Sequence, residues 1–193
     1  MSRARSDADR LLAAVDGSVA AIVVGVASTD GVTRAARGAV TGDRFEFGSI
    51  TKTMTAQVLA SLVLGGTVSL DDPIESWLDA GSNGSITLEQ LARHCSGLPR
   101  MAPNADDGVG FDELDPYAAY TADLAEAALR EVEVDRAPSP LYSNFGYQLL
   151  GLALERASGT PFEELLKAHV FGPFGLVTAS LGPHPDLVQG LKD

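Results

Sequence analysis

The sequence predicts an α+β fold in which a short helix and one β-hairpin precede a mainly helical remainder. The hairpin is indicated by two stretches, "AAIVVGVAS" from Ala20 to Ser28 and "VTRAARGAV" from Val32 to Val40, which flank the turn residues Asp30-Gly31. The helical remainder is indicated by apolar residues at helical spacing, with capping residues ahead of them. We expect residues 1–65 to form the N-terminal part of an α/β lobe and residues 66–193 a mainly helical lobe.

Capping and stop residues delimit the first two helices. Ser6, with Asp9 three residues later, predicts the start of a short helix that ends near Gly17. A longer helix is predicted from Ile50 to Leu64, because its apolar residues fall at helical spacing and Gly65-Gly66 supply the stop. This second helix is expected to be buried on more than one side.

The later helices carry similar signals. In chain order they are a short helix after the turn "LDDPI", a helix with a capping box at Thr87 and Gln90 that ends around Ser96-Gly97, a helix from Thr121, a helix that begins after Asn144 and closes at Gly159, and a helix that opens with Thr160 as N-cap and Pro161 in its first turn.

Charge and hydropathy exclude several classes of function. Fourteen Lys and Arg against 26 Asp and Glu leave a formal charge of −12, which would repel a nucleic-acid backbone. The apolar stretch from Ala20 is too short to cross a bilayer, and the start of the chain has no signal-peptide pattern. The single Cys95 fits a reducing compartment. We therefore expect a cytoplasmic protein without a membrane span or a nucleic-acid partner.

Ser49 and Lys52 form a candidate site at the start of the long apolar helix. Three residues apart, they lie on one helical face, so the amine can touch the hydroxyl. Gly48 permits a tight turn into the helix, whose free N–H groups favour developing negative charge, as a nucleophile attacking a carbonyl requires. The alternative is that Ser49 is an N-cap and that Lys52 extends to water.

A second motif, "YSN", lies in a segment that leads directly into a helix. Tyr142 brings a phenol, and Asn144 brings an amide that both donates and accepts hydrogen bonds. Taken singly, Tyr142 is interpreted as a half-buried packing residue and Asn144 as a helix cap. Their significance depends on the pairing with Ser49 and Lys52.

In this order and separation, the two motifs resemble those of the serine β-lactamase and penicillin-binding protein superfamily. The resemblance is to its class C branch, with D-alanyl-D-alanine carboxypeptidases and esterases, in which Y-x-N replaces S-x-N. Flanking stretches such as "GTVSLDDPI" and "ITLEQLARHCSGLPR" agree, over about Val24 to Leu181. The resemblance implies a β-lactamase-like fold, with Ser49 as nucleophile, Lys52 and Tyr142 as the proton-handling pair, and Asn144 as a contact to the substrate's amide or to Lys52.

The resemblance also implies a third element, a strand with K-T-G or H-x-G that walls the site and supplies a second oxyanion N–H. After Leu181 the sequence reads "GPHPDLVQGLKD", which holds no such strand. We expect the chain to be the N-terminal portion of a longer protein, or a truncated homologue. Its sheet would then need a C-terminal portion or a second chain to be completed.

The expected function is that of a serine hydrolase that forms an acyl-enzyme on a β-lactam, a D-alanyl peptide or a small ester, with activity impaired in this chain. The substrate class stays open. So does the proton route: a neutral Lys52 takes the proton of Ser49, or a charged Lys52 lowers the pKa of Tyr142 and the phenolate takes it. The alternative function is a catalytically inactive β-lactamase-like interaction or regulatory module.

Other reactive residues are interpreted as structural. His94-Cys95 could suggest a Cys–His dyad, but adjacent helical residues point in different directions. The histidines lack the spacing of a zinc site, and no nucleotide-binding motif is present, so we expect no metal and no cofactor. The segment from Ala102 to Tyr117 is interpreted as an acidic, solvated loop, and the alternative is that it borders a substrate cleft. Its carboxylates are Asp106, Asp107, Asp112, Glu113 and Asp115.

Overall fold

The computed structural model describes residues 3–15, 17–40, 43–108, 117–134, 140–182 and 187–188, with side chains from residue 7 onward. The chain divides into two compact units, Met1–Phe47 with Gly182–Asp193, and Gly48–Leu181. The helix that follows Ser49 therefore belongs to the second unit. The division into lobes at residue 65 stays a prediction.

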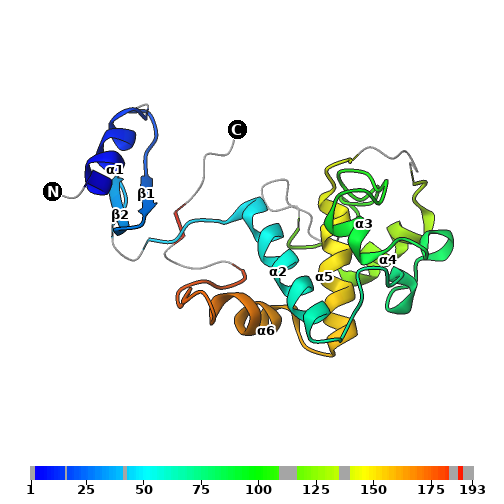
Figure 1. Cartoon of the computed structure of the whole chain (residues 1–193). Helices are drawn as coiled ribbons and strands as arrows, with labels where there is room; N and C mark the ends of the chain where they lie inside the picture. The colour runs from blue at the N-terminus through cyan, green and yellow to red at the C-terminus, as the bar shows by residue number, and fades with distance from the viewer. Residues whose placement is uncertain are drawn as a thin grey trace. The chain divides into compact units, whose positions relative to one another are not determined.

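The first unit contains helix α1 (Arg3–Ala13) and a hairpin of strands β1 (Ile22–Ser28) and β2 (Gly31–Arg37), as Figure 1 shows. The strands pair antiparallel from Ile22 opposite Arg37 to Ser28 opposite Gly31, which confirms the predicted hairpin. Gly31 permits the tight reversal because its φ of 120° is costly for residues with a side chain. Helix α1 contacts both strands, and it begins at Arg3, so Ser6 lies inside the helix and does not precede it.

The second unit is mainly helical, so the α+β prediction holds for the described residues. Its elements are the 3₁₀ turn η1 (Gly48–Ile50), α2 (Thr51–Leu64), the 3₁₀ turns η2 (Ile74–Ser76) and η3 (Gly81–Asn83), α3 (Leu88–Ala92), α4 (Ala122–Glu131), α5 (Asn144–Ser158), α6 (Phe162–Leu166) and the π-helical turn η4 (Lys167–Phe171). Searching the described residues finds no helix with the length and apolarity needed to cross a membrane.

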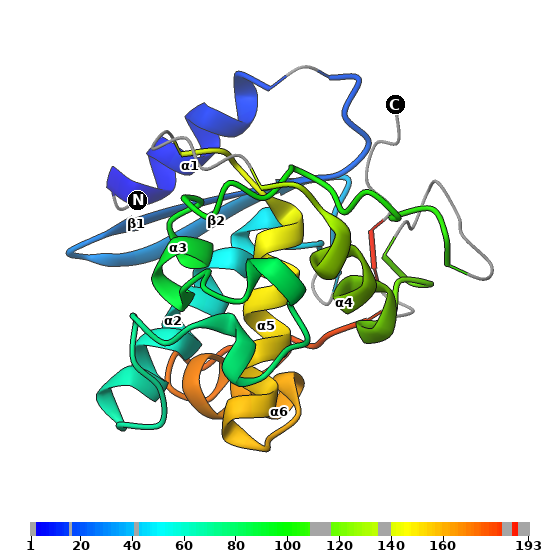
Figure 2. The ribbon, with the colours of Figure 1, turned by 90° about the vertical axis from the view of Figure 1, so that its right-hand side faces the viewer.

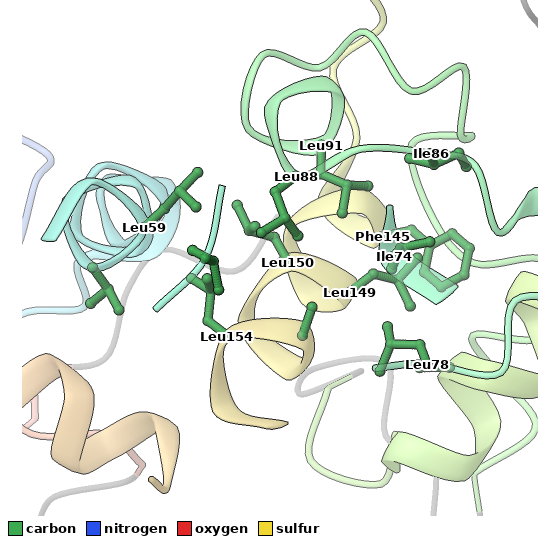
Figure 3. Close-up of a cluster of buried hydrophobic side chains, with 14 of the residues drawn as sticks. Leu59, Ile74, Leu78, Ile86, Leu88, Leu91, Phe145, Leu149, Leu150 and Leu154 are labelled. Atoms are coloured by element: carbon green, nitrogen blue, oxygen red, sulfur yellow. The ribbon is translucent and has the colours of Figure 1, made fainter. Parts of the chain in front are cut away.

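Helix α5 is the centre of the second unit's core. It contacts α2, α3, α4 and α6, and Figure 2 shows α2 and α5 side by side. Its Leu149, Leu150 and Leu154 are fully buried, and in Figure 3 they lie between Leu59 of α2 and Ile74 of η2. Burying a leucine side chain contributes about 1.5 to 3 kcal/mol, so these contacts fix α2 and α5 relative to each other.

In addition to the predicted start at Ser6, two predicted helix limits in the second unit are wrong. Helix α3 has the predicted Thr87 capping box but ends at Ala92, ahead of Ser96-Gly97, because His94 adopts a left-handed φ of 58°. Thr160 does not cap α6: Pro161 occupies the N-cap position without a side-chain hydrogen bond. The amide of Phe162 instead donates to a carboxylate oxygen of Glu155 on α5, at 2.7 Å. A tertiary contact thus replaces the local cap.

Candidate active site

Ser49 lies in the 3₁₀ turn that leads into α2, directly after Gly48. Gly48 has a φ of 50°, a left-handed conformation that side chains make costly, as the predicted tight turn requires. The N-cap position of α2 is Ile50, and it makes no side-chain capping bond. The interpretation of Ser49 as an N-cap is therefore wrong. Its exposed hydroxyl has side-chain partners instead.

Lys52 lies in the first turn of α2 and is half-buried, so it does not extend freely into water. Its Nζ donates to the Oγ of Ser49 at 3.3 Å and to the Oδ1 of Asn144 at 2.8 Å. The amine of Lys52 is thereby held between Ser49 of the first motif and Asn144 of the second.

Tyr142 contacts the same hydroxyl from the other side of the site. Its phenol lies 2.7 Å from the Oγ of Ser49, and its side chain is 38% exposed. Two cations flank the ring: the Nζ of Lys52 is 4.8 Å from the ring centroid, and the guanidinium carbon of Arg100 is 5.2 Å from it. Ser49, Lys52, Tyr142 and Asn144 are therefore all within one connected set of contacts.

The surroundings of Tyr142 favour its ionised form. Hydrogen bonding with Lys52 and then with Ser49, together with the charges of Lys52 and Arg100, lowers the pKa of Tyr142 below its ordinary 10.0. Two neighbouring tyrosines behave in the opposite way. Burial, aided by Asp107, raises the pKa of Tyr120 to about 12, and burial followed by Tyr142 raises that of Tyr147.

Asn144 is positioned by the residue before it. Ser143 is the N-cap of α5: its buried Oγ accepts from the amide of Gly146 at 2.8 Å and donates to the carbonyl of Pro99 at 2.6 Å. The interpretation of Asn144 as the helix cap is therefore wrong. Because Ser143 caps the helix, the Asn144 side chain is available to Lys52. A serine at this place is a usual capping signal, which the sequence analysis missed.

The nitrogen end of the Asn144 amide contacts two further side chains. Its Nδ2 donates to the hydroxyl of Tyr117 at 3.1 Å and to the sulfur of Met101 at 3.4 Å. Asn144 thus uses its oxygen for Lys52 and its nitrogen for neighbours outside the two motifs.

A cavity of about 580 Å³ opens at these residues. Ser49, Lys52 and Asn144 belong to its polar lining, and its apolar lining includes Tyr120, Ala125, Leu152 and Phe162. Helices α2, α4, α5 and α6 all contribute to it. Its volume falls in the range of about 300 to 1,000 Å³ that is usual for small-molecule sites.

The remaining candidates do not join this site as reactive groups. Cys95 donates from its sulfur to the carbonyl of Arg93 at 3.3 Å, whereas the Nδ1 of His94 accepts from the amide of Ser143, so the two side chains have separate partners. Asp106 and Asp107 are exposed. The other loop carboxylates, Asp112, Glu113 and Asp115, and the histidine His184 lie outside the described residues. Within the described part of the chain, no three potential ligands gather around a metal position.

Comparison with known proteins identifies the class to which this fold and site belong. A family model described as β-lactamase matches residues 8–191, so the chain belongs to the β-lactamase family, as its motifs predicted. The chain is 34% identical over 151 residues to the D-alanyl-D-alanine-carboxypeptidase/endopeptidase AmpH of Escherichia coli (strain K12), which covers 74% of this chain and 38% of that protein.

Solved structures give the same fold. The crystal structure of a β-lactamase/D-alanine carboxypeptidase from Yersinia pestis matches with a TM-score of 0.66 at 28% identity, over 86% of this chain and 50% of that one. A class C β-lactamase from Rhodobacter sphaeroides matches with a TM-score of 0.69 at 26% identity, over 90% and 49%. The chain therefore spans half or less of the length of these relatives.

Proposed function

We propose that the chain carries the acylation machinery of a serine hydrolase of the β-lactamase and penicillin-binding type. Ser49 is the nucleophile, Tyr142 the general base, and Lys52 the cation that keeps the base ionised. The observation that carries the proposal is the meeting of three groups: the Oγ of Ser49 lies 2.7 Å from the phenol of Tyr142 and 3.3 Å from the amine of Lys52. A nucleophile with a base in hydrogen-bond reach, itself oriented by a third group, is the expected arrangement for covalent catalysis.

The reaction begins with the ionised phenol. As the Oγ of Ser49 attacks the carbonyl carbon of the substrate, its proton passes to the oxygen of Tyr142. The C–N or C–O bond to the leaving group then breaks, and the leaving atom takes the proton from Tyr142. Water next attacks the acyl-enzyme and gives a proton to Tyr142. The carbonyl–Oγ bond then breaks as the Oγ of Ser49 takes this proton from Tyr142, which restores both the serine hydroxyl and the ionised phenol.

The lowered pKa of Tyr142 supports the phenolate route over a neutral lysine. The cations Lys52 and Arg100 beside the ring favour a negative oxygen at the place where the base is needed. The hydrogen bond from Lys52 to Asn144 supports a fixed ammonium group, since Asn144 offers it an acceptor oxygen. The nitrogen of the same amide donates to the hydroxyl of Tyr117. When a substrate is bound, its carbonyl oxygen can take the place of this hydroxyl as the acceptor.

The substrate is a β-lactam, a D-alanyl peptide or a small ester. The relatives named for β-lactamase and D-alanine carboxypeptidase activity support the first two. The apolar lining by Tyr120, Leu152 and Phe162 supports an apolar group on the acyl side of the scissile bond.

The test is covalent labelling of Ser49. The protein is incubated with a fluorescent penicillin and, separately, with an activated fluorophosphonate, and the modified peptide is sequenced by mass spectrometry. We expect one adduct, on Ser49, which is lost in Ser49→Ala and kept in Ser61→Ala, a matched serine on the same helix. Label on another residue would overturn the proposal. So would the absence of label on Ser49 both in this chain and in the longest protein that contains it.

A second candidate is a catalytically inactive interaction or regulatory module. The exposure of Ser49 and Tyr142 favours it, because stabilisation of a developing oxyanion depends on a site that excludes water. A two-stranded sheet is at best marginally stable alone, so both candidates include further strands, from a C-terminal portion or a second chain. Under the second candidate, Ser49→Ala leaves the biological role unchanged. Under the first, it abolishes that role.

A further inference from the structure

His94 contacts Tyr142, and it accepts hydrogen bonds from the residues on both sides of Tyr142. The carbonyl of His94 accepts from the amide of Leu141 at 2.8 Å, and its Nδ1 accepts from the amide of Ser143 at 3.1 Å. Tyr142 lies between these two anchored amides. His94, which follows the end of α3, therefore fixes the backbone on both sides of Tyr142.

The side chain of His94 also packs directly against two tyrosines. Its ring centroid lies 4.6 Å from that of Tyr142 and 4.9 Å from that of Tyr147. The imidazole thus lies against the ring of Tyr142 as well as bonding to the next residue in the chain. A shift of the imidazole would move the phenol away from Ser49.

The backbone of His94 is strained to make this arrangement. Among the described residues, it is the only one other than glycine with a positive φ, at 58°. A left-handed conformation is unfavourable for residues with a side chain, though His tolerates it better than bulky side chains do. Strain of this kind persists where the surrounding structure compensates for it, and it gathers at functional sites.

The hydrogen bond defines the protonation state of the imidazole. Because the amide of Ser143 can only donate, the Nδ1 of His94 must be unprotonated, and the proton of the neutral ring is on Nε2. Partial burial and then the charge of Lys52 lower the pKa of His94 below its ordinary 6.5. Both effects favour the neutral ring.

We propose that His94 is a positioning residue, whose neutral imidazole holds the Tyr142 segment against Ser49 and Lys52 and releases it when the ring is protonated. The proposal rests on the proposed function for its catalytic meaning, but its structural part stands on contacts that can be measured separately. It assigns a role in the site to a residue that the sequence analysis interpreted as structural.

The groups around His94 give the expected pH dependence its sign. Lys52 faces it from α2, Tyr147 from α5 and Tyr142 from the anchored segment, while the adjacent Arg93 is paired with Glu89 at 3.0 Å. As the pH falls below 6.5, protonation of Nδ1 removes the acceptor for Ser143 and adds a positive charge near Lys52. The anchoring is therefore complete above pH 6.5 and is lost as the pH falls through the lowered pKa of His94.

Three variants separate positioning from folding. His94→Asn keeps an acceptor oxygen at the same number of bonds from the backbone as Nδ1, tolerates a left-handed φ and does not titrate. His94→Gly relieves the strain but removes the acceptor and the ring. His169→Asn, at the histidine in the η4 turn, is the matched control.

The first measurement needs no turnover. The ionisation of Tyr142 is followed by ultraviolet absorbance as the difference between each protein and its Tyr142→Phe counterpart. We expect a midpoint below 10.0 in the wild type, in His94→Asn and in His169→Asn, and a midpoint shifted back toward 10.0 in His94→Gly. An unchanged midpoint in a folded His94→Gly protein would overturn the positioning role, whatever the outcome of the labelling of Ser49.

The second measurement is the rate of Ser49 labelling by the fluorophosphonate against pH. At pH 7.5, His94→Gly should label at least about tenfold more slowly than the wild type, and His94→Asn within about threefold of it. As the pH falls to 5, the wild type should lose rate faster than His94→Asn, so that the ratio of the two rates rises several-fold in favour of the variant. An equal acid dependence in the two proteins would overturn the proposed release on protonation.

Discussion

The hydroxyl of Ser49 has one partner from the first turn of the helix that follows it and another from 93 positions along the chain. The first follows from the helical repeat, since residues three apart share a face. The second depends on where the segment before α5 lies. Tyr142, the proposed base, is therefore the residue whose placement is most sensitive to the rest of the structure, and the one whose substitution is most informative.

At Tyr142, replacement by phenylalanine removes the proposed base and leaves the ring. We expect labelling of Ser49 to slow by about 10² to 10⁴-fold, while the free energy of unfolding changes by no more than about 1 kcal/mol, because the lost hydrogen bond is solvent-exposed. In the wild type the labelling rate should rise with pH toward a midpoint below 10.0, and this rise should be absent from the variant. Rapid labelling of the folded variant would assign the proton transfer to another group.

At Gly151, the substitution Gly151→Leu tests the use of the cavity. A Cβ at this position would meet the ring of Phe162 at 3.7 Å, an ordinary contact, so a longer side chain extends into the cavity without a clash at its base. We expect hydrolysis or labelling with long-chain p-nitrophenyl esters to slow by about tenfold relative to the acetate ester. Gly151→Ala is the control that adds a Cβ without filling the space. Equal effects on all chain lengths would exclude this cavity as the acyl site.

At the scale of an element, α5 supports both the core and the site. Its leucines fill the interior of the second unit, and its first turn brings Asn144 to Lys52. The buried Ser143 joins the two roles, because it caps the helix and fastens it to Pro99. The position of Asn144 is thus a consequence of how the helix begins.

The substitution Ser143→Ala should therefore affect stability and labelling together. Loss of the cap and of the bond to Pro99 should lower the free energy of unfolding by about 1 to 3 kcal/mol, measured by urea denaturation. Labelling of Ser49 should also slow, since the first turn of α5, which carries Asn144, is no longer fixed by the cap. Thr87→Ala, which removes the capping box of α3, is the matched control: it should cost about 0.5 to 2 kcal/mol and leave labelling nearly unchanged. A parallel loss of labelling in both variants would argue for general destabilisation.

At the scale of the second unit, Glu126 ties together α4, α5 and the segment after η2. One of its carboxylate oxygens accepts from Arg156 and the other from the amide of Asp79 at 2.8 Å. The hydrogen bond from Arg156 is the main cause of a lowered pKa of Glu126, and it outweighs the burial that acts in the opposite direction. Arg156 in turn donates to the carbonyl of Trp77 at 2.9 Å.

The hydrogen bonds of Glu126 predict that the free energy of unfolding decreases at acidic pH. Because the pKa of Glu126 is lower in the folded protein than its ordinary 4.5, its contribution to stability is present above that value and is lost as the pH falls below it. Glu126→Gln should reduce the free energy of unfolding by about 1 to 3 kcal/mol at pH 7, and the difference from the wild type should shrink toward pH 3. Glu131→Gln, at an exposed position on the same helix, is the control. A difference that is constant with pH would show that the carboxylate charge is not the cause.

Much of the fold was predictable because its signals are local. The hairpin turn at Asp30-Gly31, the apolar helix α2 and the Thr87 capping box each depend on residues a few positions apart. Two of the errors occurred where another contact or a strained backbone overrode the expected capping signal. Glu155 supplies the partner that Thr160 was predicted to give α6, and the strained His94 ends α3 early.

By itself, the sequence determined the pairing of Ser49 with Lys52, since helical spacing brings them together, and the family, since Tyr142 and Asn144 follow in the right order. Only the tertiary structure decided that the phenol meets the hydroxyl, because the segment that carries it is fixed by bonds to His94 and Pro99 that no sequence period encodes. Local geometry is set by covalent spacing and hydrogen bonds within a helix. The distance between two segments is set by packing and long-range hydrogen bonds, which exist only once the chain has folded.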